Sequence, residues 1–232
     1  MPADSGAPRV VLATRNAGKI AELSRILAAE GSGFDLVGLD AFPGAPDVPE
    51  TGLTFADNAL LKARAIAAYT GLPAVADDSG LAVDALHGMP GVLSARWAGK
   101  HGDDGANLEL LLGQLADTGE RGAAFICVAA LVIPGSAVGG GAVEGGAVEG
   151  GASEAGGREW TTTGALVGTL TRAPRGTNGF GYDPVFVPEG LSTTTAELAP
   201  REKDAISHRG RAFRAIAPLI AANVKGDVSL GR

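Results

Sequence analysis

The chain has 232 residues, of which 45% are hydrophobic and 19% charged, and its formal net charge is −7. This length allows one sizeable domain or two lobes with a shared core, and the acidic balance argues against non-specific binding to nucleic acid. A single cysteine, Cys127, excludes an intramolecular disulfide framework and a cysteine-rich zinc site. Residues 1–10 lack the pattern of a secretory signal, and the longest apolar run, residues 125–133, is too short to cross a bilayer. We therefore expect a cytoplasmic enzyme or binding protein without membrane or nucleic-acid partners.

The first predicted strand covers residues 9–14 and leads through a short polar turn into a helix that begins at Gly18. The turn lacks the glycine and the Ser or Thr that a Walker A loop requires. It still places backbone N–H groups of a helix N-terminus beside Lys19, an arrangement that suits an anion such as phosphate. The alternative is an ordinary helix cap, in which Thr14 and Asn16 satisfy the backbone groups.

A second helix is predicted to begin after Thr54, where Asp57 completes a capping-box pattern, and to end at Gly71. Lys62 lies on this helix, and Glu50 lies in the loop before it. Taken alone, Glu50 is more typical of a surface acid than of a metal ligand. Its meaning depends on which other acids lie near it in the fold.

Two adjacent acids, Asp77 and Asp78, interrupt the apolar pattern of residues 74–86. We expect the strand to end at these acids and a turn to begin at Ser79. One of the two acids is then expected to cap this turn, which is the structural alternative to a functional role. Together with Glu50, the pair offers an oxygen-rich set of donors that suits Mg²⁺ rather than zinc.

The second half of the chain predicts further mixed elements and one insertion. The order of strands and helices, without strict alternation, favours an α/β fold with a mixed sheet. Residues 135–157 are Gly-rich, contain the short tandem repeat GGAVEGGAVEGG and have almost nothing to bury, so we interpret them as a flexible insertion in a hairpin connection. The less favoured alternative is a functional lid. The predicted elements are a helix over 103–119, strands over 123–134, 159–170 and 184–187, and a helix over 211–223. The first of these helices is predicted to carry a stripe of leucines, Leu108, Leu111, Leu112 and Leu115, on one face.

Two later segments carry candidate binding residues. The first, "RGTNGFGYDPVFV", is Gly-rich, so its backbone can approach a ligand closely, and Phe180 or Tyr182 could stack on a flat base. The alternative is a structural loop with two core aromatics. The second, "REKDAISHRGRAF", is by itself typical of a solvated charge run, but it gathers Lys203, His208 and Arg209. Together the segments describe a metal-assisted site for a phosphorylated, aromatic ligand.

Six co-linear segments resemble one known family. They read "TRNAGK", "ETGLTFADNALLKA", "ADDSGLAVDAL", "GMPGVLSARWAG", "GFGYDP" and "EKDAISHRG", and they extend over nearly the whole chain. The chain resembles the inosine triphosphate pyrophosphatase (ITPase) family, the dITP/XTP pyrophosphatases. The resemblance implies a single domain over residues 1–232 with an elongated α/β fold, in which a central mixed sheet with flanking helices forms two lobes around a nucleotide-binding cleft. It also implies a homodimer.

The resemblance also implies roles for individual residues. Asp78 corresponds to the proton acceptor, and Glu50 and Asp78 correspond to the acidic metal-site positions. Asn178 stands where many relatives have glycine, and the Gly-rich insertion is a second departure from the family pattern. Substrate contacts are expected at Thr14, Arg15, Asn16, Ala17, Gly18, Lys19, Lys62, Ser79, Phe180, Gly181, Tyr182, Asp183, Lys203, His208 and Arg209.

The expected activity is hydrolysis of noncanonical purine nucleoside triphosphates, dITP/ITP and XTP/dXTP, between the α and β phosphates. The products would be the monophosphate and pyrophosphate, with Mg²⁺ as cofactor. Donors from His208 and Arg209 would favour a base with a 6-oxo group over adenine. Two alternatives are a phosphatase that releases orthophosphate and a non-catalytic nucleotide-binding module.

Overall fold

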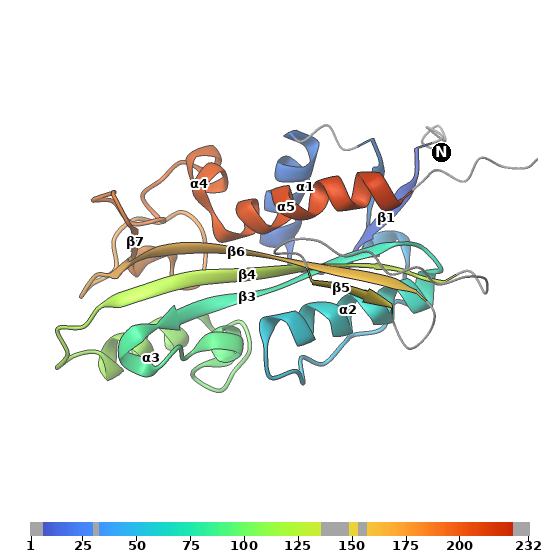
Figure 1. The fold of residues 1–232 in the computed structure, drawn as a ribbon. Helices are drawn as coiled ribbons and strands as arrows, with labels where there is room; N and C mark the ends of the chain where they lie inside the picture. Colours follow the sequence, from blue (N-terminus) through green and yellow to red (C-terminus); the bar gives the residue numbers. More distant parts are fainter. Residues whose placement is uncertain (1–6, 30–32, 136–148, 153–156, 225–232) are drawn as a thin grey trace, which may run out of the picture. The chain divides into compact units, whose positions relative to one another are not determined.

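The computed structural model describes residues 7–29, 33–135, 149–152 and 157–224. This part of the chain forms one seven-stranded mixed sheet with the order β2-β1-β3-β4-β6-β5, and β7 also pairs with β6 (Figure 1). β1 runs parallel to β2 and β3, whereas β5 and β7 run antiparallel to β6. The strands are β1 (Arg9–Leu12), β2 (Asp35–Gly38), β3 (Ala74–Val83), β4 (Gly122–Ile133), β5 (Glu149–Ala152), β6 (Arg158–Leu170) and β7 (Phe186–Pro188).

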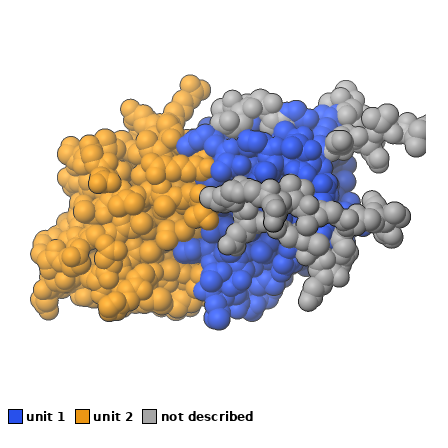
Figure 2. Space-filling model, in the orientation of Figure 1, with its two compact units in different colours: residues 1–77, 128–162, 212–232 blue, residues 78–127, 163–211 orange. Residues whose placement is uncertain are grey.

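The described chain divides into two compact units. Unit 1 comprises residues 1–77, 128–162 and 212–232, and unit 2 comprises residues 78–127 and 163–211 (Figure 2). β3, β4, β6 and the last helix contribute residues to both units, and the boundary in β3 falls between Asp77 and Asp78. The assignment of one domain to the whole chain stays a prediction.

Helices flank the sheet, as predicted for the α/β class. Within unit 1, α1 and α2 lie on opposite faces of the sheet, and within unit 2, α4 and α3 do the same (Figure 1). Among the described helices, none is long and apolar enough to span a membrane. A cytoplasmic location stays a prediction. The helices are α1 (Ala17–Ala29), α2 (Phe55–Thr70), α3 (Asp104–Gln114), α4 (Pro200–Ile206) and α5 (His208–Asn223), with 3-10 turns η1 (Leu39–Ala41), η2 (Asp84–Leu86), η3 (Gly91–Arg96) and η4 (Asp183–Val185).

The core of unit 1 packs α2 against the sheet. Many of its buried side chains are small: Ala59, Ala63 and Ala67 of α2 pack in one cluster with alanines and valines of the sheet. The predicted ends of α2 are confirmed. Thr54 and Asp57 exchange side-chain and backbone hydrogen bonds in a capping box, and Gly71 closes the helix at a φ of 68°.

The core of unit 2 packs α3 against β3, β4 and β6. Leu111 and Leu115 are fully buried, and they contact a cluster that includes Phe125 and Phe186. The predicted leucine stripe of this helix is therefore confirmed. Cys127 is also fully buried, and its thiol is not part of a disulfide.

The predicted end of the third strand is wrong. β3 continues from Ala74 through both acids to Val83, so no turn begins at Ser79 and neither acid caps one. The reason is tertiary: β3 lies inside the sheet between β1 and β4, where pairing on both sides outweighs the local turn preference of Asp, Ser and Gly.

Among the described strands and α-helices, three were not predicted. They are β2, the short helix α4 over part of the charge run, and β5. β5 falls inside the predicted insertion over residues 135–157 and pairs with β6, so these four residues are not linker. Residues 136–148 and 153–156 of that insertion lie outside the described residues.

Candidate functional site

In unit 1, the turn between β1 and α1 is built by its own polar side chains. The Thr14 hydroxyl accepts a hydrogen bond from the Asn16 N–H at 3.2 Å, and the Asn16 side chain accepts one from the Lys19 N–H at 3.1 Å. The helix-cap alternative is thus confirmed. It does not conflict with anion binding, which stays a prediction, because a helix N-terminus has four backbone donors.

The Lys19 side chain pairs with Asp77. Its Nζ lies 2.8 Å from the Asp77 Oδ2, and the two side chains are 14% and 1% exposed. A carboxylate this deeply buried needs a charged partner, and Lys19 supplies it from the first turn of α1. The pair therefore fixes the direction of Lys19 as well as satisfying Asp77.

Arg15 ties the same turn to the loop that precedes α2. Its guanidinium donates to the Ala45 carbonyl oxygen at 2.7 Å, and it lies 3.7 Å from the Asp47 carboxylate. Ala45 is buried, whereas the Arg15 side chain is half exposed. Arg15 therefore links two loops of unit 1.

Glu50 and Lys62 form a second ion pair of unit 1. The Lys62 Nζ lies 2.8 Å from the Glu50 Oε1, and the side chains are 15% and 23% exposed. The loop between them is fixed by the fully buried Asn58, whose side chain accepts the Gly52 N–H at 2.7 Å. A Cβ on Gly52 would come within 2.4 Å of the Asp57 Cβ, so only glycine fits there. The ordered loop before α2 thus holds Glu50 within ion-pair distance of Lys62.

Along β3, successive side chains point to opposite faces of the sheet. Asp77 faces Lys19, and two residues later the Ser79 hydroxyl accepts a hydrogen bond from Arg209 at 3.0 Å. Asp78, the first residue of unit 2, is also buried, at 5% exposure. Asp77 thus bonds Lys19 of unit 1, and Ser79 bonds Arg209 of unit 2.

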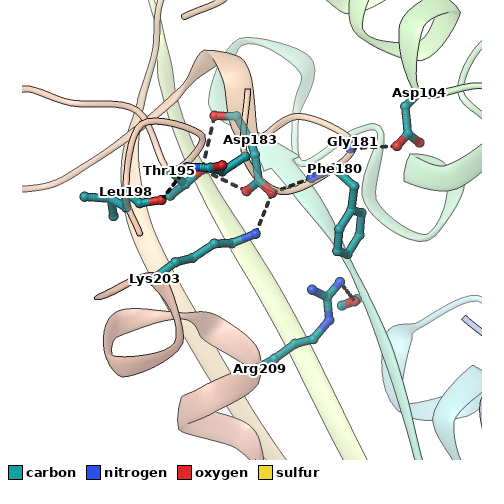
Figure 3. Close-up of polar contacts among 10 residues, drawn as sticks. Asp104, Phe180, Gly181, Asp183, Thr195, Leu198, Lys203 and Arg209 are labelled. Atoms are coloured by element: carbon teal, nitrogen blue, oxygen red, sulfur yellow. Dashed lines mark hydrogen bonds and ion pairs between the residues drawn. The ribbon is translucent and has the colours of Figure 1, made fainter. Parts of the chain in front are cut away.

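In unit 2, Asp183 organises the Gly-rich loop. Its carboxylate accepts the Phe180 N–H at 2.9 Å, the Thr195 hydroxyl at 2.8 Å and the Lys203 Nζ at 2.5 Å (Figure 3). Asp183 is 3% exposed. The close approach needs Gly179, because a Cβ there would lie 2.1 Å from the Asp183 Oδ2. Asp183 thus sets the positions of Phe180 and Lys203.

The Phe180 ring is accessible and lies beside two cations. It is 36% exposed, and its centroid lies 5.0 Å from the Arg209 guanidinium carbon and 5.3 Å from the Lys203 Nζ (Figure 3). Both distances allow a cation–π interaction. His208, by contrast, is 4% exposed and stacks on Phe125 at 4.9 Å between centroids. Lys203, Arg209 and Phe180 therefore form one group within unit 2.

Tyr182 has a structural role, unlike Phe180. It is 4% exposed and its hydroxyl donates to the Ser94 carbonyl oxygen at 2.9 Å. Burial raises the pKa of this phenol well above its usual range, and the Asp104 carboxylate raises it further. Of the two aromatics in the Gly-rich segment, one is thus exposed and the other belongs to the core.

The predicted metal ligands fit Mg²⁺ by donor chemistry. Glu50 and Asp78 offer only carboxylate oxygens, the hard donors that this ion prefers, and both are largely buried. In the ranges that the structure covers, no three His, Cys, Asp or Glu side chains gather into a metal-binding group. Mg²⁺ is commonly held by one or two carboxylates together with substrate phosphates, so two carboxylates are sufficient. The cofactor itself stays a prediction.

Sequence reasoning missed the residues that support these groups. Asn58 orders the Glu50 loop, Thr195 bonds the Asp183 carboxylate, and Asp104 accepts the Gly181 N–H at 2.8 Å. Asp104 sits in the pattern of a helix start, which gives no sign of a contact 77 residues away. Asn58 alone had a signal, since a polar residue on the buried face of a helix needs a partner.

The chain is similar to known proteins over most of its length. The model of the Ham1 family matches residues 10–219. A protein of Streptomyces coelicolor named dITP/XTP pyrophosphatase is 58% identical over 214 residues, which cover 91% of this chain and 96% of that protein. A protein of Mycobacteroides abscessus with the same name is 51% identical over 97% of this chain and 98% of its own.

Solved structures agree with the sequence comparisons. A crystal structure described as the nucleoside-triphosphatase / dITP/XTP pyrophosphatase of Mycobacterium abscessus is 52% identical, has a TM-score of 0.68, and is matched over 90% of this chain and 99% of its own. The HAM1 protein of Coxiella burnetii is 39% identical with a TM-score of 0.76, over 93% and 99% of the two chains. The resemblance and the fold class predicted from the sequence are thereby confirmed. By the matched family model and by these relatives, the chain belongs to the Ham1 family.

Proposed function

We propose that this protein hydrolyses noncanonical purine nucleoside triphosphates, dITP/ITP and XTP/dXTP, to the monophosphate and pyrophosphate. It is an enzyme of the nucleoside triphosphate pyrophosphatase class. The observation that carries the proposal is the identity of 58% over 91% of the chain to a protein named dITP/XTP pyrophosphatase. The exposed Phe180 ring beside Arg209 and Lys203 supports it, because this group suits an aromatic, anionic ligand.

Three lysines would stabilise the charge of the triphosphate. Lys19, Lys62 and Lys203 are each paired at 2.5 to 2.8 Å with a carboxylate of their own unit. An ammonium group has three donors, so a pair with one carboxylate is compatible with a contact to phosphate. Each carboxylate fixes the direction of its lysine before substrate arrives, which spares the cost of ordering a flexible chain. These pairs also compensate the positive charge of the three largely buried lysines.

Glu50 and Asp78 would hold the Mg²⁺ ion. When bound, this ion neutralises phosphate charge and orients the reacting groups. Lys62 holds the Glu50 carboxylate in place at 2.8 Å, and Asn58 orders the loop that carries it. Asp77, which bonds Lys19, is left to its role in holding that lysine.

Asp78 would act as the general base of hydrolysis. It takes a proton from the attacking water, whose oxygen forms a bond to the α-phosphorus as the bond to the bridging oxygen breaks and pyrophosphate leaves. A carboxylate inside a continuous strand is held rigidly, and such positioning is what in-line attack requires. Burial at 5% exposure also shields the group from competing water.

Selection of the base would depend on the groups around Phe180. The base stacks on the exposed ring, and Arg209, which is 5% exposed, presents a fixed guanidinium close to it. Donors from Arg209 and His208 suit the 6-oxo group of hypoxanthine or xanthine. Adenine has an amino group there, which would leave a buried donor without an acceptor and cost about 1–3 kcal/mol.

Product analysis tests this proposal. The purified protein is incubated with ITP, XTP, dITP, GTP and ATP, with and without Mg²⁺, and every product is identified. Monophosphate and pyrophosphate from ITP, XTP and dITP, only with the metal, support the proposed reaction. Diphosphate and orthophosphate would favour the phosphatase alternative, and binding without turnover would favour a nucleotide-binding module. Sedimentation of the same sample tests the expected homodimer.

A further inference from the structure

The Phe180–Gly181 turn is held by two carboxylates from different parts of unit 2. The Phe180 N–H donates to Asp183 at 2.9 Å, and the next N–H, that of Gly181, donates to the Asp104 Oδ2 at 2.8 Å (Figure 3). Hydrogen bonds to an ionised acceptor are roughly twice as strong as those between neutral groups. Two successive backbone donors are therefore fixed from two sides.

This turn needs such anchors because its backbone is permissive. Gly179 and Gly181 flank Phe180 at φ values of +79° and +61°, a region that glycine enters without cost. The Phe180 ring is 36% exposed, so packing alone does little to hold it. The position of the ring thus depends on the hydrogen bonds that the N–H groups of Phe180 and Gly181 donate.

Asp104 is an anchor that is itself well fixed. It is the first residue of α3, directly after the N-cap Asp103, whose side chain accepts the Ala106 N–H at 3.2 Å. The buried Asn107 accepts the Ala98 N–H at 2.7 Å, and Leu111 buries the helix in the core. A carboxylate in the first turn of a helix usually stabilises the helix by its interaction with the helix dipole. The Asp104 carboxylate also accepts a hydrogen bond from the turn that carries Phe180.

We propose that Asp104 is a positioning residue of the nucleotide site, which holds the Phe180 ring in the place where it stacks on the base. This inference rests on the proposed function. Asp104 acts through the Gly181 N–H and touches neither phosphate nor base. Without the Asp104 carboxylate, the turn populates other positions. The apparent affinity for nucleotide then falls in proportion to the fraction of molecules whose Phe180 ring is still placed for binding.

The test compares Asp104→Ala with a conservative variant and a matched control. Asp104→Asn keeps an oxygen that can accept the Gly181 N–H, whereas Asp103→Ala removes the neighbouring carboxylate and the N-cap but not the contact with the turn. KM and kcat for ITP are measured for each, together with the melting temperature. Hydrogen exchange of the Gly181 amide is followed by NMR, because it reports the contact without any need for activity.

For Asp104→Ala we expect KM to rise about threefold to tenfold, with kcat within a factor of about two. The Gly181 amide should exchange at least about tenfold faster. Asp104→Asn should stay within about threefold of the wild-type KM, and Asp103→Ala should lower the melting temperature without raising KM.

Two results would overturn the inference. One is faster exchange at Gly181 in Asp104→Ala with an unchanged KM. The other is an equal rise of KM in Asp103→Ala, which would make the effect one of helix stability. If the wild-type protein hydrolyses no triphosphate, the proposed function fails instead. The same three variants are then compared by calorimetric binding of ITP, where a loss of affinity only in Asp104→Ala supports the positioning role and equal affinities refute it.

Discussion

Replacing Asp183 with alanine is expected to lower the free energy of unfolding by about 3–5 kcal/mol. The Asp183 side chain is 4% exposed and pairs at 2.5 Å with Lys203, whose side chain is 12% exposed. Removing one partner of such a buried pair leaves the other charge uncompensated, and this accounts for the size of the loss. The carboxylate also accepts the Phe180 N–H and the Thr195 hydroxyl, which lose their acceptor at the same time.

Urea and thermal unfolding measure this loss. For a chain of this size, 1 kcal/mol shifts the melting temperature by about 2–4 °C, so we expect a decrease of about 6–20 °C. Asp183→Asn, which keeps an acceptor oxygen, should lose less. A double variant that adds Lys203→Met should recover part of the stability, because it removes the uncompensated charge.

The reasoning is refuted if Asp183→Ala loses less than about 1 kcal/mol, or if adding Lys203→Met recovers nothing. Either result would mean that the Lys203 charge is compensated by other groups or by water. Since Lys203 is one of the three lysines proposed to meet the triphosphate, the double variant should also have low turnover despite its recovered stability. Relative to Asp183→Ala, the double variant should thus gain stability while its turnover stays low. This combination separates the structural role of the pair from its role in the reaction.

Three further predictions follow from single contacts. Asp78→Asn should reduce turnover of ITP by about 10²-fold or more without a change in melting temperature that accounts for it, whereas near-normal turnover would remove Asp78 from the role of base. Thr54→Ala should cost about 1 kcal/mol in urea unfolding, because it breaks the capping box of α2; no loss would mean that the cap is replaced by water. The pKa of Tyr182 is raised in the folded state, so folding favours the protonated phenol. The stabilisation that results from this difference in pKa is complete below pH 10 and is lost as the pH rises further. Tyr182→Phe should therefore be less stable than the wild type at pH 7.5 and should lose less stability between about pH 9.5 and 11, with equal losses in both proteins counting against the assignment.

Local chemistry made part of this fold predictable. The ends of α2 follow from Thr54, Asp57 and Gly71, whose interactions span only a few residues. The stripe of leucines on α3 likewise needs only the helical period. In both cases the energy that decides the structure comes from neighbours in the sequence, so the pattern alone is sufficient.

The course of β3 could not be predicted because long-range partners decide it. The local residues Asp, Ser and Gly favour a turn, but Asp77 is paired with Lys19, 58 residues away, and Ser79 with Arg209, 130 residues away. These partners satisfy polar groups that would otherwise be costly in an inner strand. The same holds for Tyr182. The sequence does not show which of Phe180 and Tyr182 is buried, because the acceptor of the Tyr182 hydroxyl is the Ser94 carbonyl oxygen, 88 residues away.

A protein of net charge −7 that acts on a triphosphate must concentrate positive charge locally. We propose that Lys19 and Lys62 of unit 1 and Lys203 of unit 2 supply this charge; each is paired with a carboxylate of its own unit and is no more than 15% exposed. Lysine suits this arrangement better than arginine, since a compact ammonium can bond a carboxylate and a phosphate oxygen from one point. An arginine would offer a planar fork that matches one carboxylate with two donors, as Arg64 does with Glu159. Each ion pair thus holds its lysine in a fixed direction, and under the proposed function this preorganisation helps an acidic protein to bind a polyanion.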